Sequence, residues 1–409
     1  MAGVQRIKVS ISLEGRQHEV GELVNNERSV YFRYAASFLK SGLEISPLKL
    51  KLSDQIYTGP QHLFEGLPGV FADSIPDGWG RLVLDRALTA RGILVEDITA
   101  LERLSYVGRS GMGALQYEPV LEEEGEQLQV KLDELAKEVK TVLNGEASDI
   151  IEELLRFGGS SGGARPKILV GLHPRTSRLI QNSDALPKGY EPWLIKFPAQ
   201  TDRPDAANIE LAYYFMAKAA GIEMTMCRLL KGKSGKTYFA TKRFDRTPKG
   251  KLHMHSAAGL MYDDFRHSTM DYGKLMDCAY RLDKGAAGYE KVLRLAAFNV
   301  FAHNRDDHSK NVSFLMDGQG EWRLAPAYDL TFSSSSHGHH STMIAGESLN
   351  PGTEHLMKLA QVFKVKKAKT IIAEVKDSVS RWRIHARKAG VSKAAQSLIG
   401  KRLEAQLKL

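Results

Sequence analysis

Apolar and polar residues alternate through much of the first 60 positions. The runs RIKVSISL, SVYFRY and LKLKLS each alternate with a period near two, and Gly, Asn and Ser residues separate them. This alternation is typical of β-strands that are buried on one face only. We therefore expect the chain to begin with short antiparallel strands.

Helical spacing replaces this alternation after residue 70. The turn residues Pro76, Asp77 and Gly78 precede an amphipathic stretch, LVLDRAL, that favours a helix. The segment SYVGRSGMGALQYEP (105–119) closes the first part of the chain. Its glycines are not set between a strand and a helix and no lysine follows them, so a structural turn is favoured over a phosphate-binding loop.

A second strand-rich part begins near residue 150, after an acidic and then helical connector. The strand-like segments KILVGL, PWLIKFP and KTYFATKRFDR flank one helical stretch, and the pattern is mainly helical from about residue 254. This order predicts an α+β protein. We expect four parts, namely a mixed β/α N-terminal domain (1–122), a helical connector (123–149), a strand-rich small lobe (150–250) and a helical large lobe (251–409).

Composition indicates a folded protein. Of the 409 residues, 43% are hydrophobic and 26% are charged, and the net charge of +9 permits contact with phosphate or nucleic acid without requiring it. Cys227 and Cys278 are the only cysteines, too few for a disulfide framework or a zinc site, which suits a reducing compartment. We expect a cytoplasmic protein without a membrane partner, because neither a signal peptide nor a membrane-spanning stretch is apparent.

The segment HNRDDHSKNVSF (303–314) places charged and polar residues between apolar ones. Asp306 precedes Asn311 by five positions, which is the spacing of the catalytic aspartate and the metal-binding asparagine in protein kinases. Asp329, in PAYDL, follows where a second metal-binding carboxylate is needed. The three residues therefore predict a site for phosphoryl transfer from ATP with Mg²⁺.

Two upstream residues extend this prediction. Lys196 lies in a strand, where it could neutralise nucleotide phosphates, and Glu210 lies on the following helix, where it could pair with Lys196. Each feature alone is weak, since strand lysines and helix glutamates are commonly solvated; their order along the chain is more specific. Asn304 replaces the histidine of the usual kinase motif and no D-F-G follows, which indicates a divergent kinase.

Six motifs in this order carry a resemblance to a known family: FADSIPDGWGR, GGARPK, WLIKFP, KRFDR, NRDDHSKNVSF and LAPAYDL. Together they resemble the HipA-like toxin kinases of bacterial type II toxin–antitoxin systems over nearly the whole length. The resemblance implies an ATP- and Mg²⁺-dependent serine/threonine protein kinase with a protein-kinase-like, two-lobed catalytic domain. Asp73 and Ser74 depart from the Asn-Leu of the family, in a region expected to serve packing or partner docking.

The resemblance also assigns roles to residues. Asp306 is implied as the catalytic base, Asn311 and Asp329 as Mg²⁺ ligands, and Lys196 as a contact of the phosphates. Lys310 is expected to contact the transferring phosphoryl group. The segment after Thr241 is implied to line the adenine site as the hinge between the lobes; it comprises Lys242, Arg243 and Phe244. Lys242 stands where the family usually has glutamate, so its side-chain contact is the least secure.

The glycine-serine loop FGGSSGGARPK (157–167) has backbone N–H groups that can approach phosphate oxygens, although a flexible linker has the same composition. The resemblance favours a nucleotide loop and implies autophosphorylation of Ser160 or of its neighbour Ser161. About two added negative charges would repel ATP and switch the kinase off. The residues expected to contact the phosphates here are Ser161, Gly162, Gly163 and Lys167.

By the same resemblance the partners are a HipB-like helix-turn-helix antitoxin, DNA through that antitoxin, and a translation-related protein substrate such as an aminoacyl-tRNA synthetase. A small-molecule kinase of the aminoglycoside or choline type and a catalytically silent DNA co-repressor are the alternatives. The histidines of SSSSHGHH (333–340) are interpreted as incidental loop residues rather than a metal site. The basic stretch FKVKKAKTI (363–371) is interpreted as a solvated face, with DNA contact as the minority interpretation.

Overall fold

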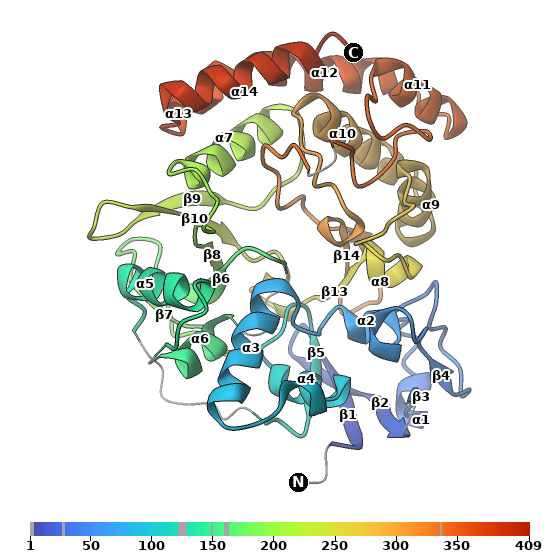
Figure 1. Cartoon of the computed structure of the whole chain (residues 1–409). Coiled ribbons are helices and arrows are strands. Elements are labelled where there is room, and N and C mark those ends of the chain that lie inside the picture. Colours follow the sequence, from blue (N-terminus) through green and yellow to red (C-terminus); the bar gives the residue numbers. More distant parts are fainter. Residues whose placement is uncertain (1–3, 27–28, 122–128, 149, 159–162, 336–337) are drawn as a thin grey trace. The chain divides into compact units, whose positions relative to one another are not determined.

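The computed structural model describes residues 4–26, 29–121, 129–148, 150–158, 163–335 and 338–409. The chain forms two compact units, each of which combines helices and strands (Figure 1). The first comprises Met1–Pro204, Arg228–His255 and Met316–Gly320, and the second comprises Asp205–Cys227, Ser256–Leu315 and Glu321–Leu409. In the described ranges, no helix is long and apolar enough to cross a membrane.

The first unit begins with an antiparallel sheet in the order β4-β3-β2-β1-β5. Its strands are β1 (Arg6–Leu13), β2 (Arg16–Asn26), β3 (Ser29–Tyr34), β4 (Tyr57–Thr58) and β5 (Leu115–Glu118). The predicted alternation is confirmed in β3, where Val30, Phe32 and Tyr34 are buried and the residues between them are not. The run LKLKLS is not a strand; the amide of Leu50 donates to the carbonyl of Ser46 and closes a turn.

A second sheet in the first unit has the order β7-β6-β8-β10-β9. Its strands are β6 (Lys167–Leu172), β7 (Leu179–Gln181), β8 (Glu191–Lys196), β9 (Cys227–Lys231) and β10 (Thr237–Lys242). The short strands β11 (Arg246–Thr247) and β12 (Gly250–Lys251) form a hairpin, and β13 (His253–Ser256) follows them.

Helices cover one face of this second sheet. The helices of the unit are α1 (Ala36–Leu39), α2 (Gly69–Ala72), α3 (Gly78–Ala90), α4 (Ala100–Val107), α5 (Leu132–Leu143) and α6 (Ile151–Gly158). Apolar side chains of α3, α5 and α6 share one buried core with Ile168, Val170, Trp193 and Ile195 of the sheet. The stretch expected to be a connector therefore supplies a packed helix, α5, and a helix of the N-terminal part lies on the strands expected to form the small lobe.

The second unit is mainly helical. Its helices are α7 (Ala206–Ala219), α8 (Ala257–Met261), α9 (Tyr272–Asp283), α10 (Ala287–Phe301), α11 (Thr353–Val362), α12 (Ala368–Ser380), α13 (Trp382–Lys388) and α14 (Lys393–Gln406). The strands β14 (Ser313–Met316) and β15 (Trp322–Leu324) are neighbours in a small sheet. Helix α10 is buried along most of its length and packs on α9 and α12. Helix α7, assigned from the sequence to the small lobe, belongs to this unit, whereas the four-part division stays a prediction.

Candidate active site

The predicted catalytic segment leaves the end of α10 in a sharp turn. His303 has a φ of +53°, in the left-handed region that few residues other than glycine adopt, and its side chain is buried. The side-chain amide of Asn304 donates to Oδ1 of Asn299 at 2.9 Å, and both side chains are buried. The backbone is therefore fixed to the helix before it reaches Asp306.

Asp306 is exposed, whereas the residues on either side of it, Arg305 and Asp307, are buried. The side chain of Asp306 is 60% exposed, whereas the next residue, Asp307, has a side chain that is 1% exposed. His308 Nε2 lies 3.7 Å from Oδ1 of Asp306. A fixed backbone with one accessible carboxylate is the arrangement that a general base needs, because a substrate hydroxyl must approach within hydrogen-bond distance of it.

The five-residue spacing brings Asn311 back to Asp306. Nδ2 of Asn311 donates to the backbone carbonyl of Asp306 at 2.9 Å, across the 3-10 turn Ser309–Asn311. This bond uses the amide nitrogen, so Oδ1 of Asn311 is the side-chain atom that could bind a cation. An amide oxygen is among the ligands that Mg²⁺ accepts in proteins.

Asp329 is held next to this segment by its neighbour Tyr328. The Tyr328 hydroxyl donates to the backbone carbonyl of Lys310 and forms a second hydrogen bond with Ser313 Oγ, each at 2.6 Å. Asp329 itself has a φ of +56°, a conformation that costs energy in a residue other than glycine. The two bonds of Tyr328 thus tie the neighbour of Asp329 to the Lys310–Ser313 stretch.

The donor set fits Mg²⁺. Asp329 offers carboxylate oxygens and Asn311 an amide oxygen, both hard ligands, and Mg²⁺ usually completes its shell with phosphate and water. The described residues include no cluster of three or more His, Cys, Asp or Glu side chains that could hold an ion. An ion bound by Asn311 and Asp329 would therefore take further ligands from a phosphate substrate and from solvent.

Lys310 is oriented by an aromatic ring. Its Nζ lies 4.8 Å from the centroid of the Phe265 ring, a distance at which a cation is attracted to the ring face. The His308 ring also lies against Phe265, with 5.4 Å between the ring centroids. Phe265 therefore holds two polar side chains of the catalytic segment beside Asp306.

The buried carboxylate of Asp307 fixes the segment through four hydrogen bonds. Its carboxylate accepts hydrogen bonds from the hydroxyl of Tyr272 (3.0 Å), Nδ1 of His340 (3.0 Å) and the backbone amides of Ser341 (2.9 Å) and Thr342 (3.3 Å). Burial, together with the nearby carboxylate, raises the pKa of Tyr272 well above its usual value, so that tyrosine stays a donor. Four donors satisfy a buried charge that would otherwise be costly.

His340 makes a buried contact with the candidate site that the sequence did not reveal. Its side chain is fully buried, Nδ1 contacts Asp307, and Nε2 has no partner among the described atoms. A hydrogen on Nδ1 lets the ring donate to the Asp307 carboxylate. The sequence favoured incidental loop histidines over a metal site; His340 in addition makes a buried contact with Asp307, whereas His337 lies outside the described residues.

The first unit contributes two lysines on one face of its second sheet. Trp193, Ile195 and Phe197 are buried in the core, and Lys196 lies on the opposite face of β8, as predicted. The antiparallel register places Lys167 of β6 directly opposite Lys196. Two ammonium groups at one cross-strand position could bind a polyanion such as a triphosphate.

Gly163 lies close to the first of these lysines. It has a φ of +92°, and a Cβ placed on it would be only 2.6 Å from Nζ of Lys167, so glycine leaves the room that the ammonium group occupies. Ser160, Ser161 and Gly162 lie outside the described residues, and so does the predicted autophosphorylation site. Glu210 is buried on α7 of the second unit; its expected pair with Lys196 of the first unit stays a prediction.

The residues predicted to line the adenine site have partners within the first unit. Lys242 Nζ lies 2.8 Å from Glu191 Oε1, and this hydrogen bond lowers the pKa of Glu191. The buried guanidinium of Arg243 donates to Asp245 and to the carbonyl of Gly111. This geometry favours a structural role for the Arg243 side chain over the predicted nucleotide contact. Phe244 is half-buried.

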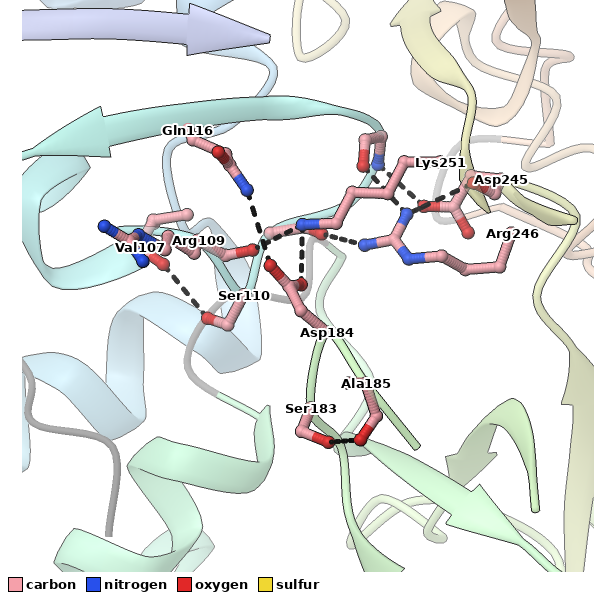
Figure 2. Close-up of polar contacts among 12 residues, drawn as sticks. Val107, Arg109, Ser110, Gln116, Ser183, Asp184, Ala185, Asp245, Arg246 and Lys251 are labelled. Atoms are coloured by element: carbon pink, nitrogen blue, oxygen red, sulfur yellow. Dashed lines mark hydrogen bonds and ion pairs between the residues drawn. The ribbon is translucent and has the colours of Figure 1, made fainter. Parts of the chain in front are cut away.

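The motif KRFDR belongs to a buried polar cluster that Figure 2 shows around Asp245. The backbone carbonyls of the 105–119 segment accept hydrogen bonds from Arg246 and Lys251, and the amide of Gly113 donates to Asp245 at 2.7 Å. Although burial opposes ionisation, the flanking arginines lower the pKa of Asp245. In a phosphate-binding loop the backbone N–H groups face an anion. In this segment three backbone carbonyls face the cationic side chains of Arg246 and Lys251 instead. The predicted structural turn is confirmed.

The residues that depart from the family motif are also paired. Asp73 Oδ2 lies 2.6 Å from Nδ1 of His255, whose Nε2 lies 3.0 Å from Ser46 Oγ, and Ser74 accepts a hydrogen bond from Tyr117. Ser, His and Asp in this order resemble a hydrolytic triad. Ser46 is 1% exposed and His255 is fully buried, so this chain of hydrogen bonds serves packing rather than catalysis.

The structure matches a solved chain over almost its whole length. The chain, from the complex of HipA, HipB and operator DNA of the Shewanella oneidensis MR-1 toxin–antitoxin system, is 15% identical in sequence, with a TM-score of 0.68. The alignment covers 98% of this chain and 95% of that one. At this identity the similarity shows the fold, which confirms the predicted α+β, kinase-like architecture with an N-terminal domain.

Sequence comparisons identify the family. A Sinorhizobium fredii (strain NBRC 101917 / NGR234) protein named "Putative kinase Y4dM" is 26% identical over 151 residues, which are 34% of this chain and 36% of that protein. The chain therefore spans only about a third of that relative's length. Residues 11–118 match the HipA N-terminal domain, and residues 159–382, more than half of the chain, match the HipA-like C-terminal domain. This protein belongs to the HipA-like family.

Proposed function

We propose that this protein is an ATP- and Mg²⁺-dependent serine/threonine protein kinase that acts as the toxin of a type II toxin–antitoxin module. The observation that carries the proposal is the geometry of residues 303–311, where the carboxylate of Asp306 is exposed and the neighbouring residues Asn304 and Asp307 are buried and hydrogen-bonded. Asn311 is tied to the backbone of that same aspartate. Family membership supports the same assignment.

In this proposal Asp306 accepts the proton of the substrate hydroxyl as its oxygen bonds to the γ-phosphorus. The bond from that phosphorus to the bridging oxygen breaks, and ADP leaves. Bound Mg²⁺, held by Asn311 and Asp329, would supply charge neutralisation at the phosphates. Lys167 and Lys196 bind phosphate oxygens, and Lys310 contacts the phosphoryl group in transfer.

The proposed partners follow from the family. The similar Shewanella HipA was solved with HipB and operator DNA, and we propose a HipB-like antitoxin for this chain, with DNA contacted through it. The proposed substrate is a translation-related protein such as an aminoacyl-tRNA synthetase. Ser160, or Ser161, is proposed as the autophosphorylated residue whose modification switches the enzyme off.

The proposal is tested by incubating the purified protein with γ-labelled ATP and Mg²⁺. The wild type should label itself on serine, and Asp306→Ala should lower the initial labelling rate about a thousandfold, because a general base and its positioning effect are both lost. Asp377→Ala is the matched control, since Asp377 has a similarly exposed carboxylate (63%) in an ion pair on α12. It should label at the wild-type rate.

Three results would each reject part of this proposal. Undiminished labelling of Asp306→Ala would show that the base lies elsewhere. A wild-type protein that neither labels itself nor binds ATP would favour the catalytically silent co-repressor. Labelling of a small aminoglycoside or choline-like acceptor in preference to any protein would favour the small-molecule kinase.

A further inference from the structure

The start of α3 contacts the end of the glycine-serine loop. The backbone amide of Gly163 donates to Oδ1 of Asp77, and the backbone amide of Trp79 donates to the carbonyl of Gly163 at 3.0 Å. Both polar groups of one loop residue are therefore bonded to a turn about 85 residues earlier in the chain. All three residues belong to the first unit.

The bond from Gly163 to Asp77 replaces a bond that the N-cap side chain usually makes within its own helix. Asp77 occupies the N-cap position of α3, yet within the described chain its side chain caps no amide of that helix. An N-cap side chain usually satisfies one of the unpaired amides of the first turn. Here the carboxylate of Asp77 accepts the hydrogen bond of the Gly163 amide instead. The amide of Trp79, which has no acceptor within the helix, donates to the carbonyl of Gly163.

Packing at this contact admits only glycine. Gly78 has a φ of +46°, and a Cβ placed on it would lie 2.6 Å from the carbonyl carbon of Gly163 and 2.7 Å from Cα of Ala164. At the other end of the loop, a Cβ on Gly158 would lie 2.6 Å from the carbonyl oxygen of Lys167 and 3.1 Å from Nε1 of Trp79. The turn at residues 77–79 thus contacts the described residues on both sides of the loop.

The same contact reaches the lysine pair. Gly163 packs against Nζ of Lys167, which is 6% exposed and lies opposite Lys196 in the sheet. A shift of Gly163 would therefore change the space available to the Lys167 ammonium group. Trp79, 1% exposed, belongs to the core beneath this sheet and makes the turn rigid.

We propose that Asp77, Gly78 and Trp79 form a clamp, the α3 clamp, that fixes Gly163 and Lys167 in the position in which they bind nucleotide phosphates. Asp77 is thus a positioning residue for ATP. This inference rests on the proposed kinase function, because it takes the phosphates to be those of ATP. It gives the part of the chain that matches the HipA N-terminal domain a role in nucleotide affinity.

The first test is Asp77→Ala, with Asp77→Asn as the conservative variant. Asp77→Ala should weaken binding of Mg·ATP at least about tenfold and speed amide exchange of residues 163–167 in the nucleotide-free protein, because Gly163 loses its acceptor. Asp77→Asn keeps a side-chain oxygen that can accept the Gly163 hydrogen bond. It should therefore restore most of the Mg·ATP affinity and most of the protection of the amides from exchange. At saturating ATP, kcat should change much less than KM, since Asp306 and Asn311 are untouched.

A matched pair of glycines provides the second test. Gly78 and Gly92 lie at the two ends of α3, and both have a positive φ, +46° and +74°. A Cβ on Gly92 would meet no described atom within 4 Å, whereas a Cβ on Gly78 collides with Gly163. Both alanine variants bear the strain of the left-handed conformation, but only Gly78→Ala should weaken ATP binding.

The outcomes separate the clamp from the proposed function. Wild-type protein that binds no Mg·ATP would overturn the proposed function and the inference with it. Wild-type protein that binds ATP, with Gly78→Ala and both Asp77 variants binding equally tightly, would overturn the clamp alone. Equal weakening by Gly78→Ala and Gly92→Ala would likewise overturn it, because the effect would then come from helix strain.

Discussion

Two adjacent aspartates of the catalytic segment have opposite surroundings. Asp306 faces solvent, and Asp307 is enclosed by four hydrogen-bond donors. An exposed carboxylate can meet a substrate, whereas a buried and fully bonded one fixes the backbone on both sides of it. The position of Asp306 is therefore expected to depend on residues that do not touch the substrate. Among them, His340 donates to Asp307 with a fully buried side chain.

His340→Ala should reduce kcat about tenfold while leaving the Kd of Mg·ATP almost unchanged. The variant leaves the buried Asp307 carboxylate one donor short, which costs about 1–3 kcal/mol of stability and loosens the segment that carries Asp306. Kinase assays at saturating ATP and chemical denaturation would measure both effects. His340→Asn, which retains an N–H donor, should recover part of the rate.

His339 offers the control for this prediction. It precedes His340, is exposed, and hydrogen-bonds Ser348 Oγ at 2.9 Å rather than the catalytic segment. His339→Ala should therefore leave kcat unchanged. A rate loss of the same size in both variants would mean that the loop, rather than the Asp307 contact, determines the rate.

At the scale of elements, features set by local pattern were predictable and features set by distant contacts were not. Strand β3, strand β8 with Lys196 facing away from the core, and helix α3 follow from periodicity, and the Asp306–Asn311 contact follows from spacing within one turn. The run LKLKLS alternates like a strand but is closed into a turn, because Leu50 bonds to Ser46 and to the hydroxyl of Tyr34. The residue pattern around Leu50 does not predict its bond to Tyr34, which lies 16 positions earlier.

The same limit applies to the site. Asp307 and His340 are 33 positions apart, and Asp77 and Gly163 are 86 apart. Neither pair has a sequence signature, because each forms only when the chain returns to the same place in the fold. The residues predicted to bind or react lie in short motifs, whereas the distant contacts of the residues that position them are visible only in the structure.

Helix α5 leads to a prediction about stability. The sequence favoured a solvated connector, but Leu135, Val139 and Val142 are buried against the second sheet. Leu135→Ala should therefore lower the free energy of unfolding by about 2–4 kcal/mol, as expected for a truncated core leucine. Thermal or urea unfolding would measure the change.

A surface position on the same helix serves as the reference. Lys137 is exposed, and Lys137→Ala should stay within about 0.5 kcal/mol of the wild type. If Leu135→Ala is equally mild, α5 does not contribute to the core in solution and the connector interpretation is correct.

Over the whole molecule, positive charge is concentrated near the C-terminus. Residues 363–409 contain thirteen Lys and Arg against three Asp and Glu, although the net charge of the entire chain is only +9. The remaining 362 residues are thus close to neutral. Because long-range electrostatic attraction depends on clustered charge, this distribution strengthens the case for contact between the C-terminal helices and a polyanion.

Four exposed lysines at the start of this region allow the question to be tested: Lys364, Lys366, Lys367 and Lys369. Replacing all four with Gln should lower the affinity of the proposed antitoxin complex for its DNA and reduce the salt dependence of binding, by about 0.9 in the logarithmic slope for each phosphate that a lysine no longer neutralises. ATP-dependent labelling should not change, because none of the four lies in the catalytic segment. The control replaces four exposed lysines of the first unit, Lys188, Lys231, Lys233 and Lys236, and so removes the same charge from another surface. Equal DNA affinity and equal slope in the two variants would show that the C-terminal patch is a solvated face, as its composition alone first suggested.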